Sequence, residues 1–268
     1  MKDIVVGLGE IGGPIYRLLS KTNTVVGFDK DPKLMDEKKF ERFKNVKTDF
    51  IHIAIPFSEK FQKSVIEIVE KFDPNCLVIH STISPHTTEN LQKKLKIPLI
   101  YSATRGVHKR MSKDLLRYTK FFSVYSWAPN AKKAEKEFLK KMKKAGIKTK
   151  KMSNPLVLEV AKIVVDTSYY GWLINFAQLS NMIAIENKVD YNEMWSFSDE
   201  IHKFLGNRPK LFPGFIGGHC VIPNLSLINE ESLWQIDKIN NLYAQKVKDA
   251  KSIAKKYVKG KQSYNATE

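Results

Sequence analysis

A cysteine lies in a loop made largely of glycine, proline and apolar residues. Cys220 follows Gly217, Gly218 and His219 in the segment RPKLFPGFIGGHCVIPN, residues 208–224. A thiolate is a strong nucleophile once its pKa is lowered, and an adjacent histidine can contribute positive charge. A cysteine can also be an inert, buried small hydrophobe. Because functional residues gather on loops, the pattern favours a nucleophile with room for a substrate at the two glycines.

A lysine inside a long apolar stretch is the second chemical candidate. Lys162 and Asp166 are four residues apart within a run of mostly apolar residues at 156–187. On a solvated helix such a pair is an ordinary ion pair, worth about 0.5 kcal/mol. A lysine on a helix that is apolar on most sides is costly unless it is used. A partly desolvated lysine can stabilise an alkoxide or act as a general base.

A glycine-rich turn near the N-terminus has the spacing of a phosphate-binding loop. Residues 7–12 read GLGEIG, after the apolar segment 4–6 and before a helical pattern at 11–19. In a dinucleotide-binding turn the glycines allow a tight bend, a close approach to the pyrophosphate and close packing of helix on strand. A structural turn without a ligand is the alternative. The residues that we expect to contact the cofactor are Gly7, Gly9, Glu10, Ile11 and Gly12.

An acid follows this turn at the distance that a ribose contact requires. Asp29 comes about twenty residues later, at the end of the second apolar segment, where a carboxylate can bind a ribose diol. The same carboxylate would repel a 2′-phosphate, although Lys30 and Lys33 nearby weaken this effect. The pattern therefore predicts NAD as the cofactor.

These groups need a scaffold, and the apolar pattern predicts one in two parts. Residues 1–152 alternate apolar segments with amphipathic ones, which is typical of a parallel sheet with crossover helices. We expect an α/β fold, with an N-terminal Rossmann domain containing a doubly wound parallel sheet and a C-terminal all-α domain. The expected strands are 3–6, 24–28, 50–55, 77–80, 99–101 and 121–125, and the expected helices of this part are 12–19, 59–72, 87–95 and 131–145.

The pattern changes after Asn154 and Pro155. Apolar residues then recur at steps of three or four over 156–187, which predicts one long helix that is apolar around most of its circumference. Such a helix must be buried in its domain or against a second copy, so we expect a homodimer. A further helix is expected at 232–257. We therefore predict a helical catalytic and dimerisation domain at 153–260 and a disordered tail at 261–268.

Composition restricts the remaining classes of function. The chain has 268 residues, two cysteines and a formal net charge of +17. Two cysteines form no disulfide framework, and neither a signal peptide nor a membrane-spanning stretch is evident, so we expect a cytoplasmic protein that does not bind a membrane. Glutamates interrupt the lysine-rich segment 132–151, and no nucleic-acid motif accompanies it, so a solvated helix is favoured over a nucleic-acid surface. The histidines show no metal-ligand spacing, and no metal is expected.

Four segments resemble the two N-terminal domains of UDP-glucose and GDP-mannose dehydrogenases, within the 6-phosphogluconate dehydrogenase-like superfamily. The family's third strand ends in V-P, and the segment FIHIAIP here ends at Pro56. The family's S-T-x-P-P-G-T-T is matched by STISPHTT at 81–88, and its A-E-x-x-K by LEVAK at 158–162. Its signature loop P-G-x-G-G-H-C-x-P is matched by PGFIGGHCVIP at 213–223, and this match is the most specific.

The resemblance implies oxidation of a primary alcohol on a sugar-like, anionic substrate, first to an aldehyde and then to an acid, with two NAD reduced. It implies that Cys220 adds to the aldehyde as a thiohemiacetal, which is oxidised to a thioester and cleaved by water. It also makes Lys162 the group that assists the first oxidation. The other residues that it places in the site are Asp166, Asn224 and Thr82 for catalysis, and Pro56, Ser81 and Thr82 for the cofactor.

The chain departs from the family in charge and in length. Asp166 stands where the family has Asn, and Asn224 where it has Asp, so a carboxylate and an amide are exchanged. The family's P-E-x-x-x-x-G segment, whose glutamate assists hydrolysis, corresponds to ATRGVH at 103–108, which has none. The family's nucleotide-binding third domain would begin after residue 257, so we expect either a different substrate or a separate chain that supplies this part. The candidate substrate-binding residues are Arg105, His108, Gly217, Gly218 and His219.

Two other functions stay open at this point. The first is a two-electron β-hydroxyacid or sugar-phosphate dehydrogenase, with Lys162 as the base and Cys220 uninvolved. The second is an inactive dinucleotide-binding scaffold, which the missing glutamate suggests. The number of NADH formed per substrate separates the first from a four-electron enzyme, and tight NAD binding without turnover would indicate the second.

Overall fold

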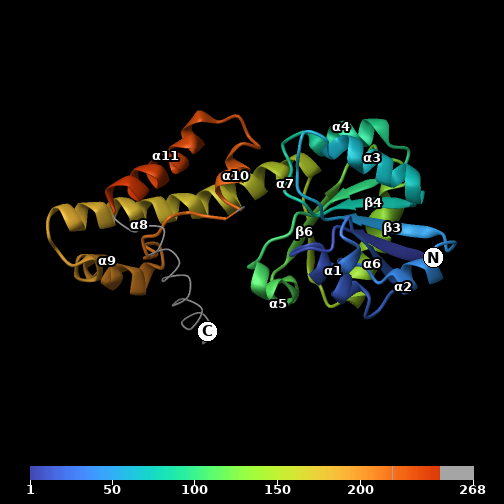
Figure 1. Ribbon diagram of the computed structural model, residues 1–268, viewed down its shortest axis with the longest axis horizontal. Helices are drawn as coiled ribbons and strands as arrows, with labels where there is room; N and C mark the ends of the chain where they lie inside the picture. The colour runs from blue at the N-terminus through green and yellow to red at the C-terminus, as the bar shows by residue number, and fades with distance from the viewer. Residues whose placement is uncertain (219, 248–268) are drawn as a thin grey trace. The chain divides into compact units, whose positions relative to one another are not determined.

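The structure, a computed structural model, describes residues 1–218 and 220–247 (Figure 1). It divides into two compact units, Met1–Lys162 and Ile163–Glu268. The tail expected at 261–268 and the last part of the helix expected at 232–257 lie outside the described residues. No helix in the described part of the chain is long and apolar enough to cross a membrane.

The first unit, which is described throughout, is built on a seven-stranded sheet in the order β2-β1-β3-β4-β5-β6-β7. The chain crosses from β2 to the far side of β1 to form β3, so the sheet is doubly wound, with its topological switch point between β1 and β3. All neighbouring strands are parallel except β5 and β6, which are antiparallel and correct the all-parallel prediction. The strands are β1 (Lys2–Val6), β2 (Val25–Phe28), β3 (Thr48–Ile53), β4 (Cys76–Ile79), β5 (Leu99–Tyr101), β6 (Lys120–Val124) and β7 (Thr149–Lys151).

Helices cover both faces of this sheet (Figure 1). Successive strand residues enter opposite cores, as when Val5 packs on one face and Ile4 on the other. Each fully buried aliphatic side chain of this kind stabilises the fold by about 1.5–3 kcal/mol. One face packs against α1 (Gly12–Leu19), α5 (Met111–Arg117) and α6 (Ala131–Lys144), and the other against α2 (Glu37–Arg42), α3 (Phe61–Phe72), α4 (Thr87–Lys94) and α7 (Pro155–Ala161).

The α/β fold class and the strands expected from the apolar pattern are confirmed, with shifts of one or two residues at most ends. Within the first unit, the pattern missed β7, α2 and α5. These elements are short and rich in charged residues, and their local sequences carry little of the apolar periodicity that marks the others.

The second unit is helical in its described residues. It contains α8 (Tyr169–Glu186), α9 (Tyr191–Leu205), α10 (Ile222–Leu225) and α11 (Glu231–Lys246), with α8 packed against α9 and α11. Gly171 lets α8 approach its neighbours closely, since a Cβ at this position would lie 3.0 Å from a methyl group of Val221 and 3.1 Å from one of Ile236. The helix expected at 232–257 is matched by α11 as far as Lys246, and its continuation beyond residue 247 lies outside the described residues.

The long helix expected at 156–187 is not a single α-helix. A π-helical segment, Lys162–Ser168, separates α7 from α8. The Ser168 Oγ donates to the Ile163 carbonyl five residues earlier, at 2.8 Å. Because π-helical turns occur frequently at functional sites, it is informative that this one contains both Lys162 and Asp166.

Candidate functional site

The glycine-rich turn has the conformation that its spacing predicts. Gly7 has a φ of +85°, and a Cβ there would lie 2.7 Å from the carbonyl oxygen of Ala54, the residue that directly follows β3. A Cβ on Gly12 would lie 1.7 Å from the Gly7 carbonyl oxygen. Gly9 differs, because no described atom beyond its chain neighbours lies within 4 Å of a Cβ placed there. Gly7 and Gly12 are therefore required by backbone packing, whereas Gly9 leaves the open side that a pyrophosphate needs.

Asp29, at the end of β2, is bonded directly to this turn. Its Oδ2 accepts from the Leu8 backbone N–H at 2.5 Å, and its Oδ1 accepts from the Asp31 N–H at 2.9 Å. These bonds hold the carboxylate beside the turn, where an acid can bind a ribose diol. With the turn at the β1–β3 switch point and at the start of α1, the residues present fit a dinucleotide.

The ends of β3 and β4 are joined by Ser81. Its buried hydroxyl donates to the Ile55 carbonyl at 2.5 Å, and its own carbonyl accepts from the Tyr101 hydroxyl at 3.2 Å. Ser81 therefore holds the strand ends together, next to Pro56 and the half-buried Thr82. These three candidates share one edge of the sheet, the edge that carries the glycine-rich turn.

Glu159, which lies in the LEVAK segment, links two helices of the first unit. It is fully buried, and its two carboxylate oxygens accept from the backbone N–H groups of His86 and Thr88, both at 2.8 Å. These N–H groups belong to the start of α4, where a carboxylate satisfies unpaired donors and the helix dipole. Burial raises the pKa of Glu159, while these hydrogen bonds act in the opposite direction. The contact joins α7 to α4 and so positions the segment that ends at Lys162.

The basic loop at 105–110 is organised by a buried aspartate. The Asp114 Oδ2 accepts from the Val107 N–H at 2.8 Å and from the Arg110 Nε at 3.1 Å. Gly106 has a φ of +140°, and a Cβ there would lie 2.8 Å from the Asp114 Cβ. The loop therefore has a defined conformation, which the buried Asp114 side chain fixes through these contacts.

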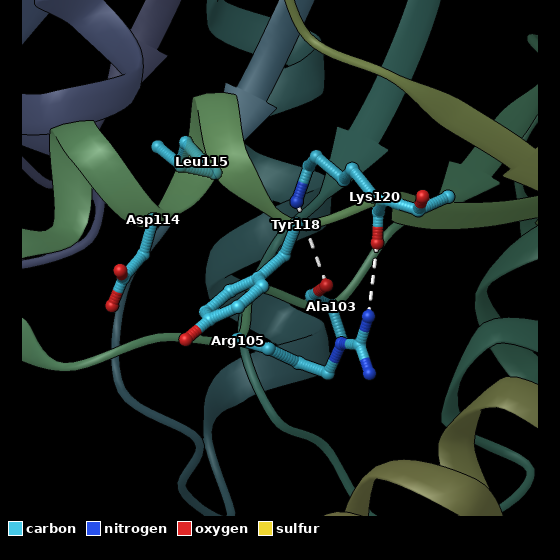
Figure 2. A pocket seen from close by; sticks show the side chains of 7 residues that line it. Ala103, Arg105, Asp114, Leu115, Tyr118 and Lys120 are labelled. Carbon is cyan, nitrogen blue, oxygen red and sulfur yellow. Dashed lines mark hydrogen bonds between the residues drawn. The ribbon is translucent and has the colours of Figure 1, made fainter. Parts of the chain in front are cut away.

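Two candidate substrate residues in this loop contact the protein itself. The Arg105 guanidinium donates to the Thr119 carbonyl at 2.9 Å (Figure 2) and lies 4.8 Å from the centre of the Phe121 ring. The His108 Nδ1 lies 2.7 Å from a carboxylate oxygen of Glu10, in the glycine-rich turn. The structure thus brings His108 to the glycine-rich turn.

A buried lysine lies behind this loop, beside a small cavity. The Lys120 Nζ donates to the Ser102 carbonyl at 2.8 Å and the Thr104 Oγ1 at 3.0 Å, and Figure 2 shows it directed at the Ala103 carbonyl. Burial lowers the pKa of Lys120 to about 7, and the positive charges of Lys162 and Arg105 act in the same direction. Lys120 was not predicted as a candidate, because nothing in the sequence distinguishes a buried lysine from the many exposed ones.

Two stacked histidines continue this polar network. The His52 Nδ1 lies 2.9 Å from the His80 Nε2, and the His80 Nδ1 lies 3.1 Å from the Ser102 carbonyl oxygen. A carbonyl only accepts, so His80 donates from Nδ1 and accepts at Nε2 from the His52 Nδ1–H. Burial lowers both pKa values, that of His52 to about 3. No cluster of three or more potential metal ligands occurs among residues 1–218 and 220–247.

In the second unit, three buried amides hold the loop that carries Cys220. The Asn240 side chain accepts from the Ile216 N–H at 2.7 Å and donates to the Ile216 carbonyl at 3.1 Å. Gln178 donates to the Gly214 carbonyl at 2.6 Å and to the Asn240 Oδ1 at 2.9 Å, and it accepts from Asn175 at 2.8 Å. Polar residues at buried positions of α8 and α11 thus position the loop. In the sequence, these amides could have been noticed as polar residues on otherwise apolar helix faces.

This arrangement leaves the Cys220 thiol at the surface of its unit. Cys220, Gly217 and Gly218 are exposed, and Gly218 has a φ of +84°. Asn224 lies half-buried in α10, and His219 lies outside the described residues. Cys76, in contrast, is buried in β4, and burial raises the pKa of its thiol. The interpretation of Cys220 as a buried hydrophobe is therefore wrong.

Comparison with protein-family models and with curated proteins finds no match. The structure resembles UDP-D-ManNAc dehydrogenase from Pyrococcus horikoshii, with a TM-score of 0.73, 18% identity, and coverage of 91% of this chain and 69% of that chain. It also resembles UDP-N-acetyl-mannosamine dehydrogenase from Staphylococcus aureus, with a TM-score of 0.66, 19% identity, and coverage of 91% of this chain and 68% of that chain. A third similar structure is 3-hydroxyisobutyrate dehydrogenase from Mycobacterium tuberculosis, with a TM-score of 0.65, 15% identity, and coverage of 93% of this chain and 94% of that chain. The chain therefore has the fold of these dehydrogenases, as its motifs predicted.

Proposed function

We propose that the protein is an NAD-dependent oxidoreductase that oxidises a primary alcohol on a sugar-like, anionic substrate. The turn at Gly7–Gly12 carries the proposal, because its close-packed glycines, its open side at Gly9 and its bond to Asp29 have the features that a dinucleotide requires. Solved dehydrogenases of the same fold, two of them named for nucleotide sugars, support the reaction class.

The residues of the first unit supply the cofactor site and the first oxidation. Backbone N–H groups at the start of α1 bind the pyrophosphate, and Asp29 binds the ribose diol. The cofactor, when bound, accepts the hydride. Lys162, in the π-helical segment, stabilises the alkoxide that forms as the hydroxyl loses its proton to solvent.

Cys220 supplies the second oxidation. Its sulfur adds to the aldehyde carbon while the carbonyl oxygen gains a proton, giving a thiohemiacetal. A second NAD, if bound, would accept a hydride from the thiohemiacetal carbon, and the hydroxyl proton would pass to solvent, which would leave a thioester on Cys220. Water then cleaves the carbon–sulfur bond, releasing the acid and the thiol. The exposure of Cys220 in a loop held by buried amides supports this role.

The direct test measures binding and turnover separately. Calorimetric titration should show that NAD binds, and NADH absorbance should identify the substrate in a screen of sugar nucleotides, sugar phosphates and hydroxyacids. Asp29→Asn, which keeps the side-chain shape, should lose NAD affinity. If the wild-type protein fails to bind NAD, the proposal is wrong, and if it binds NAD without turning over any substrate, the scaffold alternative is favoured.

A second candidate is a two-electron hydroxyacid dehydrogenase with Lys162 as the base. The neighbour that is a 3-hydroxyisobutyrate dehydrogenase matches over 93% of this chain and 94% of its own, which supports this candidate. The absence of a glutamate from the 103–108 loop supports it as well. One NADH per substrate, with full turnover by Cys220→Ser, would establish this reaction in place of the four-electron one.

A homodimer is the partner that we propose. Large apolar side chains on one face of α8 are exposed at helical spacing, and covering them would remove the cost of hydrating a continuous apolar patch. They are Tyr169, Trp172, Phe176, Leu179 and Ile183. A separate nucleotide-sugar-binding chain is an expectation that co-purification would test.

A further inference from the structure

A threonine hydroxyl is bonded to the buried amine of Lys120 at one edge of the sheet. Thr104 lies three residues after β5, at the carboxyl ends of the parallel strands, where ligands bind in open α/β sheets. Its Oγ1 lies 3.0 Å from the Lys120 Nζ, and both residues are buried, with 6% and 5% exposure. Nothing in the proposed mechanism so far uses this pair.

The partners of Lys120 suit a neutral amine as well as an ammonium ion. Its Nζ lies 2.8 Å from the Ser102 carbonyl oxygen and 3.5 Å from the Ala103 carbonyl oxygen, in addition to the contact with Thr104. Carbonyl oxygens only accept hydrogen bonds, whereas a hydroxyl both donates and accepts. A neutral amine therefore has two N–H donors for the two carbonyls and one lone pair for the Thr104 hydroxyl.

The ionisation of Lys120 consequently sets the direction of the Thr104 hydroxyl. When Lys120 is an ammonium ion, its Nζ donates to the Thr104 Oγ1, and the hydroxyl proton points elsewhere. When Lys120 is neutral, the Thr104 O–H donates to Nζ instead. The threonine oxygen can then accept a hydrogen bond from another hydroxyl that reaches this edge of the sheet.

The charges around Lys120 favour the neutral amine near neutral pH. Burial lowers the pKa of Lys120 to about 7, and the positive charges of Lys162 and Arg105 act in the same direction. His80 contributes no positive charge there, because burial lowers its pKa as well. Asp114 lines the cavity beside Lys120, but its carboxylate is bonded to the basic loop. A lysine in such surroundings can act as a proton acceptor.

We propose that Thr104 accepts the proton of the substrate alcohol and passes its own proton to Lys120, which acts through Thr104 as a positioning residue. The O–H bond of the substrate breaks as a new O–H bond forms on Thr104, and the former Thr104 proton binds the lone pair of the Lys120 amine. An alkoxide remains on the substrate, and Lys120 becomes an ammonium ion. The inference rests on the proposed function, and it gives the route by which the alcohol proton leaves.

A cavity beside Lys120 offers the last part of this route. Its volume is about 10 Å³, which is room for about one water molecule, and Tyr118, an exposed residue, lines it as well (Figure 2). The Lys120 ammonium ion releases its proton to solvent by this path, which restores the neutral amine. No other co-reactant is needed.

The first experiment needs neither substrate nor cofactor. NMR of the full chain, labelled with ¹³C at the lysine Cε atoms, should show one lysine that titrates near pH 7, well below the exposed lysines. Lys120→Arg should remove this signal. Lys113→Met, which removes an exposed lysine of α5, is the matched control and should leave it in place. A Lys120 that titrates above about pH 9 would overturn the inference, because it could not accept a proton near neutral pH.

The second experiment measures single-turnover NADH formation against pH, with the alcohol that the substrate screen identifies. The wild-type rate should rise about tenfold from about pH 6 to about pH 8, as does the neutral fraction of a group with a pKa of about 7. Lys120→Arg keeps donors for the carbonyls but cannot accept a proton, so its profile should be flat and its rate about a hundredfold lower at about pH 8.

Variants of Thr104 test the pair without altering the lysine. Thr104→Val has a similar shape but no hydroxyl, so it should also lose the rise with pH. Thr104→Ser keeps the hydroxyl and should restore the rise. A rise that persists in both Lys120→Arg and Thr104→Val would overturn the inference and leave the proposed function intact.

Two further results separate a structural role and a failure of the proposed function. If Lys120→Arg and Thr104→Val lose NAD affinity in calorimetry and keep the wild-type pH profile, the pair holds the fold of the site, and this inference alone fails. If wild type forms no NADH with any substrate class, the proposed function fails and the inference fails with it, even where Lys120 titrates near pH 7.

Discussion

Acidification should destabilise the first unit through the buried pair His52 and His80. An ordinary histidine binds a proton near pH 6.5, whereas burial lowers the pKa of His52 in the folded chain to about 3. Between these values the unfolded chain holds a proton that the folded chain lacks, so the free energy of unfolding falls as pH falls from about 6.5 toward 3.

The magnitude is large relative to the stability of a domain. A shift from 6.5 to about 3 corresponds to about 5 kcal/mol for His52 alone, and the lowered pKa of His80 acts with the same sign. The total free energy of unfolding of a domain is about 5–15 kcal/mol. We therefore expect much of the stability to be lost by pH 4.

Urea unfolding at a series of pH values from 7.5 to about 4, followed by circular dichroism, measures this effect. His52→Asn retains an N–H donor near the position of Nδ1 but does not titrate, so its stability should fall less steeply with pH. His86→Asn is the control, since His86 is exposed and asparagine tolerates its positive φ. Parallel pH dependences for wild type and His52→Asn would refute the reasoning.

Four further predictions test other parts of the structure. The pKa of Lys120 is lowered from 10.5 to about 7, so the unfolding free energy should rise between pH 7 and 10.5, and Lys120→Met should remove this rise in urea titrations. NAD should bind at least tenfold more tightly than NADP, a difference of about 1.4 kcal/mol, and equal affinities by calorimetry would contradict the role of Asp29. Cys220→Ser should bind NAD normally but form no acid, and intact-protein mass spectrometry of wild type with substrate and NAD should show an adduct on Cys220 that is slow to hydrolyse. Sedimentation should show a dimer at micromolar concentration that Phe176→Asp dissociates, and a wild-type monomer would count against the α8 interface.

Much of the fold was predictable because its signals are local. The apolar strands and the spacing of the glycine-rich turn lie in short contiguous segments, and each requires a particular backbone conformation wherever it occurs. Elements without such a signal were missed, as the lysine-rich β7 shows. The antiparallel pairing of β6 was also missed, because apolar runs do not encode strand direction.

The candidate site was predictable only in part. The contact of Asp29 with the glycine-rich turn was predictable, because the motif fixes their spacing along the chain. The surroundings of Cys220 were not, since Gln178 and Asn240 act from helices distant in sequence. The π-helical geometry around Lys162 likewise depends on hydrogen bonds that an apolar period does not reveal.

The sequence by itself determined the α/β class, the position of the glycine-rich turn and the loop candidate Cys220, because these depend on residues adjacent along the chain. Only the tertiary structure decided that Glu159 binds the start of α4, that His52 faces His80, and that His108 pairs with Glu10. Each of these contacts joins residues from separate elements. Their partners are selected by strand order, register and burial, which arise only when the whole sheet packs against its helices.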